Sequence, residues 1–184
     1  CRFWRDRTAP DADDAARVTF RNLPVLMRFL AQDAMRCEGA VRRVLLSEQG
    51  FHCRDDADGE RDQAVAFALA WSIVAREWGG VRVARLQPLG QSDWLTEAFP
   101  GEYAGLPLGA FLLHRHVDHA HEGGLQLGLW TRRADSVCTP ERRRRIADVF
   151  AACDTAAWPA CAAFALPVLG VDDLAAWRPV DPPK

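Results

Sequence analysis

The pattern of apolar and polar positions predicts one dominant helix, over residues 60–78. Two neighbouring apolar stripes run through this segment at helical spacing. The stripes consist of Phe67, Trp71, Val74 and Trp78 and of Val65, Leu69 and Ile73. Such a wide apolar face is typical of a helix buried in the core. Asp58 is placed to cap its start, and Gly79 and Gly80 are placed to end it.

Shorter apolar patterns predict two further helices. Apolar positions after Asn22 and Pro24 indicate a helix over residues 23–36. Thr139, Pro140 and Glu141 indicate the start of another, because they combine a cap, a proline and an acid at the positive end of the helix dipole. Its buried face would be formed by Ile146, Val149, Phe150 and Cys153.

Alternating and short apolar runs predict the strands. We expect strands over residues 81–86, 110–117, 125–131 and 162–169. Residues 41–47 fit either a strand or a helix, because periodicity does not distinguish the two. Residues 118–124 have the composition of a hairpin turn. The element order predicts an α+β fold with an antiparallel sheet of about four to five strands and helices on one face, with a ferredoxin-like arrangement as the specific guess.

Composition limits the class of protein. The chain has 184 residues, 49% of them hydrophobic, and a formal net charge of −2. That length suits one domain of roughly 100–200 residues. The near-neutral charge argues against nucleic-acid binding, and no apolar run approaches the ~18 residues of a membrane-spanning helix. We expect a tether or juxtamembrane segment at 1–15, a single α+β domain at 16–170 and a tail at 171–184.

The first residues suggest a cell-envelope location. Cys1 could be the lipid-carrying cysteine of a processed bacterial lipoprotein. Alternatively, the aromatic and arginine residues at 1–7 could follow a membrane helix. An arbitrary fragment start explains the same residues, and a cytoplasmic location remains the alternative.

The six cysteines carry no zinc-ribbon or thioredoxin motif. Cys37 and Cys53 flank one segment, and Cys153 and Cys161 flank another. In an oxidising compartment these pairs could form disulfides, whereas in a reducing one they would be small buried apolar residues.

Four of the five histidines lie within eight residues, 114–121. His114, His116, Asp118 and His119 locally resemble the metal-binding HxHxDH signature of the metallo-β-lactamase superfamily. The resemblance implies a zinc site, and neutral imidazoles with a carboxylate suit that ion. Further histidine ligands are expected later in that superfamily, but no histidine follows His121, so we do not assign the chain to it. A solvated turn and a pH-responsive contact surface are the other interpretations.

Other polar runs and the tryptophans complete the candidates. The run of arginines at 142–145 is either a solvated face or an anion-binding one. The chain has seven tryptophans, and Trp94, Trp130 and Trp177 lie outside the main helix stripe. Tryptophan is favoured in protein interfaces, so these three are the candidate partner-binding residues.

Two functions follow from these candidates. The leading hypothesis is a non-enzymatic protein-binding domain of a bacterial cell-envelope protein, of an accessory, adaptor or immunity type. Its partner would be another protein, with membrane contact only through an N-terminal anchor and no cofactor. The alternative is a zinc-dependent hydrolase or metal-binding protein, in which His114, His116, His119 and Asp118 hold the metal.

Overall fold

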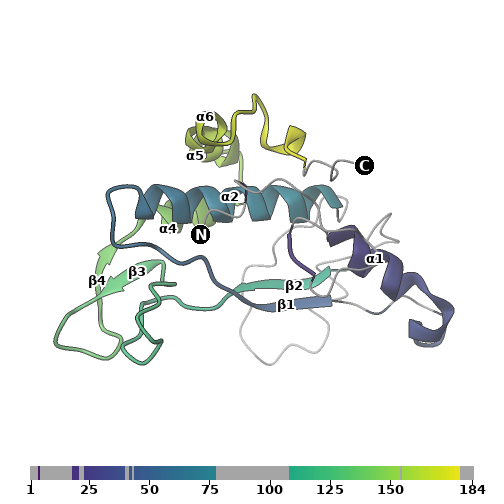
Figure 1. The fold of residues 1–184 in the computed structure, drawn as a ribbon, viewed down its shortest axis with the longest axis horizontal. Coiled ribbons are helices and arrows are strands. Elements are labelled where there is room, and N and C mark those ends of the chain that lie inside the picture. The colour runs from purple at the N-terminus through teal and green to yellow at the C-terminus, as the bar shows by residue number, and fades with distance from the viewer. Residues whose placement is uncertain are drawn as a thin grey trace, which may run out of the picture.

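The computed structural model describes residues 4, 18–20, 23–39, 42, 44–77, 108–153 and 155–178. It mixes helices and strands, which confirms the α+β class. Figure 1 shows the long helix α2 (Gly59–Glu77) between two layers. Strands β1 (Val44–Gln49) and β2 (Leu108–Leu113) lie on one side, and the short helices α5 (Trp158–Ala162) and α6 (Leu166–Leu169) lie on the other.

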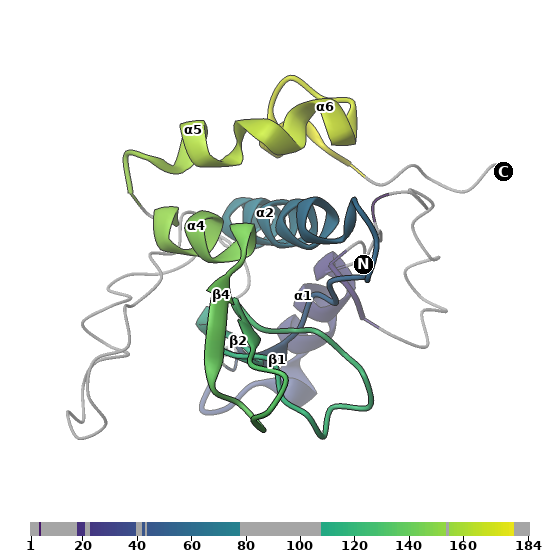
Figure 2. The same ribbon diagram turned by 90° about the vertical axis from the view of Figure 1, so that its left-hand side faces the viewer.

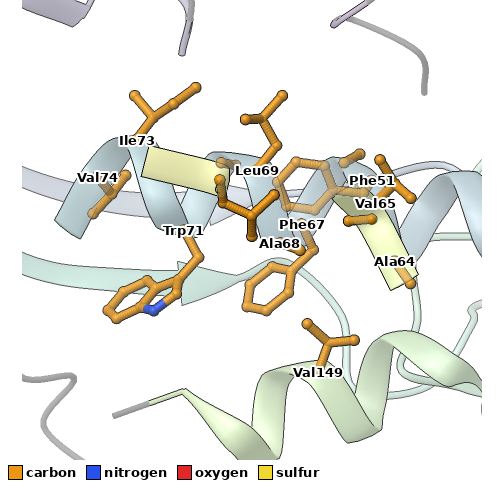
Figure 3. Close-up of a cluster of buried hydrophobic side chains, with 14 of the residues drawn as sticks. Phe51, Ala64, Val65, Phe67, Ala68, Leu69, Trp71, Ile73, Val74 and Val149 are labelled. Carbon is orange, nitrogen blue, oxygen red and sulfur yellow. The ribbon is translucent and has the colours of Figure 1, made fainter. Parts of the chain in front are cut away.

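Helix α2 forms the centre of the core, as its two apolar stripes predict. All residues from 64 to 74 are buried. Figure 3 shows Phe67 and Trp71 pointing from one side of the helix and Leu69 and Ile73 from the opposite side. The helix begins at Gly59, where a Cβ would lie 1.9 Å from the carbonyl oxygen of Arg54. Only glycine allows the two backbones to approach so closely.

Phe67 is at the centre of an aromatic cluster that joins several elements. Its ring centroid lies 5.9 Å from that of Phe51, 6.2 Å from that of Phe111 and 5.8 Å from that of Phe150. These partners come from the loop after β1, from β2 and from helix α4 (Arg145–Ala152). Each such aromatic pair contributes about 0.5–1.5 kcal/mol beyond its area burial, so the cluster fixes α2 against the sheet and α4.

Strands β1 and β2 run parallel, with Leu46 opposite Phe111. Helix α2 lies between them in the chain, so the three elements form a βαβ unit. The carboxyl ends of parallel strands meet at one edge of the sheet. The loops that leave β1 and β2, residues 50–58 and 114–129, therefore begin at that same edge.

A second strand pair follows at residues 130–143, and it corrects the predicted helix start. Strand β3 (Trp130–Arg132) pairs antiparallel with β4 (Pro140–Arg143), and α4 begins only at Arg145. The cap-like residue Thr139 instead ends the connection between the strands, and Pro140 begins β4. The carbonyl of Thr139 accepts a hydrogen bond from the N–H of Arg133 at 2.9 Å.

The strand predicted over residues 162–169 is wrong, because this segment is helical. It comprises the end of α5, a 3-10 turn at Ala163–Ala165 and α6. Pro159 and Pro167 lie in the first turns of α5 and α6, where a missing N–H costs no helical hydrogen bond. Gly170, with φ of 66°, ends α6 in the left-handed conformation.

Three other predicted elements are shorter or differently paired. The helix predicted over 23–36 is α1 (Leu23–Ala31), followed by a 3-10 turn at Asp33–Met35. The ambiguous segment 41–47 includes the first residues of strand β1, which continues to Gln49. Val117 and Trp130 form a parallel bridge, so residues 118–124 are not the turn of a hairpin between neighbouring antiparallel strands.

The described residues contain two sheets of two strands each, one parallel and one antiparallel. The predicted four- to five-stranded antiparallel sheet is absent from this part of the chain, because the α2 crossover brings β1 and β2 together in the same direction. The strand predicted at 81–86 lies outside the described residues.

The segment that follows α6 packs on the core. The 3-10 turn at Leu174–Ala176 contacts α2, and the Trp177 side chain is 1% exposed. Figure 2 shows this segment on the same side of α2 as α5 and α6. Within the described ranges, no helix has both the length and the apolar character to cross a bilayer.

Candidate functional site

The loops that leave β1 and β2 are held together by hydrogen bonds at the carboxyl edge of the parallel pair. The N–H of Cys53 donates to the carbonyl of Gln126 at 2.8 Å, and the N–H of Gln126 donates to Nδ1 of His52 at 3.1 Å. Gln63 of α2 closes the arrangement by donating to the carbonyl of Phe51 at 2.8 Å. The region around Gln126 is therefore built from both loops and the first turns of α2.

Asp118 and Arg144 form a buried ion pair beneath these loops. Arg144 donates from Nη1 to Oδ1 of Asp118 at 2.7 Å and from Nη2 to Oδ2 at 2.6 Å. The side chains are 9% and 2% exposed, respectively. Oδ1 also accepts from the N–H of Gly128 at 2.8 Å. Such a bidentate, buried pair fixes the orientation of both side chains.

Gln126 links this pair to the surface. Its Oε1 accepts from Nη2 of Arg144 at 2.7 Å, and its Nε2 donates to Oδ1 of Asp55. At Gly128 the backbone passes close to that of Asp118, since a Cβ there would lie 2.4 Å from the backbone nitrogen of Asp118. Only glycine allows the backbone at this position to approach Asp118 so closely.

A pocket of about 370 Å³ opens over this network. The volume is within the range of about 300–1,000 Å³ that is common for small-molecule sites. Its wall includes the buried residues Asp118 and Arg144. It also includes His119 and Arg132, which are partly exposed, and Asp55, which is exposed. The other lining residues are Ala120, Gly124, Leu125, Gln126, Thr131 and Ala134.

A second polar cluster lies beside the pocket in the predicted histidine segment. Glu122 pairs with Arg115, and Nε2 of His114 lies 3.5 Å from Oε2 of Glu122. The hydrogen bond from Arg115 holds the pKa of Glu122 below its ordinary value. The cluster joins the two ends of the segment 114–122.

The structure does not gather the four predicted metal ligands into a metal site. Asp118 binds Arg144, and His114 faces Glu122. Nδ1 of His119 accepts from the backbone N–H of His121 at 3.3 Å, and His116 is exposed. Among the described residues, no three His, Cys, Asp or Glu side chains are arranged to hold a metal ion.

Two of the three predicted partner-binding tryptophans lie among the described residues. Trp130 is half-buried in β3 and packs against the core, and Trp177 is buried within it. Trp94 lies outside the described residues. Trp177 presents almost no surface to a partner, since only 1% of it is exposed.

The four consecutive arginines each have a different neighbour. These are Glu60 for Arg142, Asp148 for Arg143, Asp118 for Arg144 and the ring of Phe164 for Arg145. The hydrogen bond from Arg142 holds the pKa of Glu60 below its ordinary value. The four positive charges along β4 and the start of α4 therefore have different partners and do not form one anion site.

The described cysteines are free thiols: Cys37, Cys53, Cys138, Cys153 and Cys161. Neither pair that flanks a segment is joined by a disulfide in this structure. Cys53 is 4% exposed, and burial raises the pKa of its thiol. A buried, protonated thiol is a poor nucleophile.

Sequence reasoning missed most of the pocket. The sequence predicted Asp118 as a metal ligand and placed Arg144 in the run of arginines. It did not indicate that the two residues form an ion pair. Gln63 offered one usable signal, since an amide inside an otherwise apolar helix must find buried partners. Nothing in the spacing of Asp55, Gln126 or Arg132 indicated that they line one cavity.

Comparisons with known proteins give a family. The model of a family described as a family of unknown function (DUF5722) matches residues 1–79 and 107–177. Searches of the curated proteins and of the solved structures find no match.

Proposed function

The chain belongs to DUF5722, a family of unknown function, and for this member we propose that it acts as a protein-binding domain. The partner would cover the outer face of the β1–β2 pair. The supporting observation is that this face carries exposed leucines, with Leu45 60% exposed and Leu112 39% exposed. The proposal retains the leading hypothesis from the sequence, but it rests on a different surface.

Strand alternation places the two leucines on one face. Leu46 and Phe111 are opposite each other and pack into the core from the inner face. Leu45 precedes Leu46 in β1, and Leu112 follows Phe111 in β2. Both leucines are exposed. Because successive side chains in a strand point to opposite faces, Leu45 and Leu112 share the outer face.

An open parallel pair is unusual and favours a covering partner. Parallel sheets occur almost only with both faces covered. Among the described residues, no further strand pairs with β1 or β2. Burying a leucine side chain completely contributes about 1.5–3 kcal/mol, and a protein that covers Leu45 and Leu112 would gain the part of this that corresponds to their exposed area.

Several earlier expectations remain predictions within this proposal. The bacterial cell-envelope location, the N-terminal anchor and the accessory, adaptor or immunity role are among them. The ferredoxin-like antiparallel sheet is not part of the proposal, since β1 and β2 run parallel. Trp177 does not support it either, because its side chain is buried.

The test measures complex formation with purified products of neighbouring genes by titration calorimetry. We expect Leu45→Glu and Leu112→Glu each to weaken the complex at least about tenfold, which corresponds to 1.4 kcal/mol. Val137→Glu is the matched control, because Val137 is 45% exposed and lies in the β3–β4 connection. Equal affinities for all four proteins would contradict the proposed face.

A second measurement separates partner binding from self-association. If light scattering shows a dimer that Leu45→Glu converts to a monomer, the covering partner is a second copy of this chain. If the chain stays monomeric and none of the tested proteins binds, the protein-binding function is rejected.

A further inference from the structure

We propose that the pocket at the carboxyl edge of the β1–α2–β2 unit binds a small zwitterion, a molecule with one ammonium and one carboxylate group, as in an amino acid or a dipeptide. This site is separate from the outer face of β1 and β2. The inference rests on which charged groups of the pocket are already satisfied and which are not.

The floor of the pocket is neutral and rigid. Asp118 and Arg144 use both carboxylate oxygens and both terminal guanidinium nitrogens on one another. Further bonds from Gly128 to Asp118 and from Arg144 to Gln126 hold the pair in place. A ligand that displaced this pair would leave a buried charge without its partner, at a cost of several kcal/mol. The floor therefore shapes the site without supplying a charge to the ligand.

Arg132 supplies the positive charge. Its Nη1 donates to the carbonyls of Arg133, Ala134 and Ser136 at 3.0, 3.4 and 2.8 Å, which fixes the guanidinium against that turn. Within the described part of the chain, its Nε and Nη2 make no hydrogen bond. These two donors form the planar fork that matches a carboxylate.

His119 adds a donor of the same kind. Its Nδ1 accepts from the N–H of His121, so a neutral ring carries its proton on Nε2. The residue is partly exposed and lines the pocket. His119 therefore contributes a hydrogen-bond donor to the lining of the pocket.

Asp55 supplies the negative charge. Its Oδ1 accepts from Nε2 of Gln126, while Oδ2 makes no hydrogen bond or ion pair with any described residue. Gln126 in turn is held by Arg144, so the Asp55 carboxylate is positioned from the buried network. A carboxylate oxygen in this state is a suitable acceptor for an ammonium group.

The balance of charges selects the ligand class. Two aspartates and two arginines line the pocket, and one of each neutralises the other in the floor. The charges that remain are one positive, on Arg132, and one negative, on Asp55. A simple anion would be repelled by Asp55 and a simple cation by Arg132. A zwitterion leaves the complex neutral and pairs both groups.

The test uses the whole chain and defined probes. Alanine and the dipeptide glycylglycine are titrated by calorimetry, and alanine is compared with derivatives that lack one charge. Alanine amide lacks the carboxylate, N-acetylalanine lacks the ammonium, and glucose is an uncharged polar control. We expect at least one zwitterion to bind, and its amide and N-acetyl forms to bind at least tenfold more weakly.

Two variants assign the charges to residues. Arg132→Gln and Asp55→Asn should each weaken the zwitterion at least tenfold. Arg133→Gln and Asp56→Asn are matched controls, since both residues are exposed neighbours that do not line the pocket, and they should bind as the wild type does. Circular dichroism spectra like that of the wild type show that all four variants are folded.

Three outcomes would overturn the proposal. These are no binding of any zwitterion at millimolar concentration, tighter binding of glucose than of the zwitterions, and equal losses in Arg132→Gln and Arg133→Gln. Neither Leu45→Glu nor Leu112→Glu changes the pocket, so these variants should bind the zwitterion normally.

Discussion

Asp118 and Arg144 are 26 residues apart in the chain, yet they form a two-point ion pair that is almost fully removed from solvent. The pair connects the loop after β2 to the start of α4. Removal of either partner leaves the other as a buried charge, which typically costs 3–5 kcal/mol. The pair therefore holds together two segments that form the pocket.

We therefore expect Asp118→Asn to lower the free energy of unfolding by about 3–5 kcal/mol, measured by urea denaturation. The double variant Asp118→Leu/Arg144→Met should lose less than Asp118→Asn alone, because no unpaired charge remains. Arg133→Ala is the control: it breaks the exposed pair with Asp135 and should cost less than about 1 kcal/mol. Equal losses in Asp118→Asn and Arg133→Ala would show that Asp118 and Arg144 are not buried together.

Phe67 provides the matching prediction for the apolar core. It is 1% exposed and contacts rings from three other segments. We expect Phe67→Ala to destabilise the chain by about 3–5 kcal/mol, measured by the same denaturation. Phe29→Ala should change stability by no more than about 0.5 kcal/mol, because Phe29 is 47% exposed. A small effect of Phe67→Ala would mean that the cluster is not packed as described.

The core helix could be predicted from the sequence, whereas several strands could not. Residues 60–78 combine length with two apolar stripes, and no alternative structure buries both. Residues 162–169 are short and apolar, so periodicity did not decide their structure. Pro167 was the overlooked signal, because proline is excluded from central strands but is tolerated in the first turn of a helix.

The candidate site was less predictable because its contacts are distant in sequence. The pattern of residues 114–119 suggested metal binding, but the partner of Asp118 lies in the arginine run. Local spacing says nothing about which of four arginines will reach it. Likewise, the parallel pairing of β1 and β2 depends on where α2 packs, which no local pattern records.

The Glu60–Arg142 pair predicts a dependence of stability on pH. The hydrogen bond from Arg142 lowers the pKa of Glu60 from its ordinary value of 4.5. The stability that this carboxylate contributes is complete above pH 4.5 and is lost as the pH falls through the lower pKa of the folded state. We expect Glu60→Gln to flatten the decline in unfolding free energy below that pH.

The control for this pH effect is Glu141→Gln, which removes an exposed carboxylate of β4, the strand that carries Arg142. Its unfolding free energy should follow the wild-type curve over the same acid range. If Glu60→Gln and wild type decline in parallel, the pair with Arg142 does not form in solution.

Metal analysis tests the remaining alternative from the sequence. Both carboxylate oxygens of Asp118 accept hydrogen bonds from Arg144, so zinc would have to compete with a buried cation for them. We therefore expect protein purified without a histidine tag to contain well under one zinc per chain, by elemental analysis. His116→Ala should leave that content unchanged, since His116 is exposed and no described cluster of three ligands includes it. One zinc per chain that His116→Ala removes would restore the metal-binding hypothesis and would require Asp118 to exchange Arg144 for the ion.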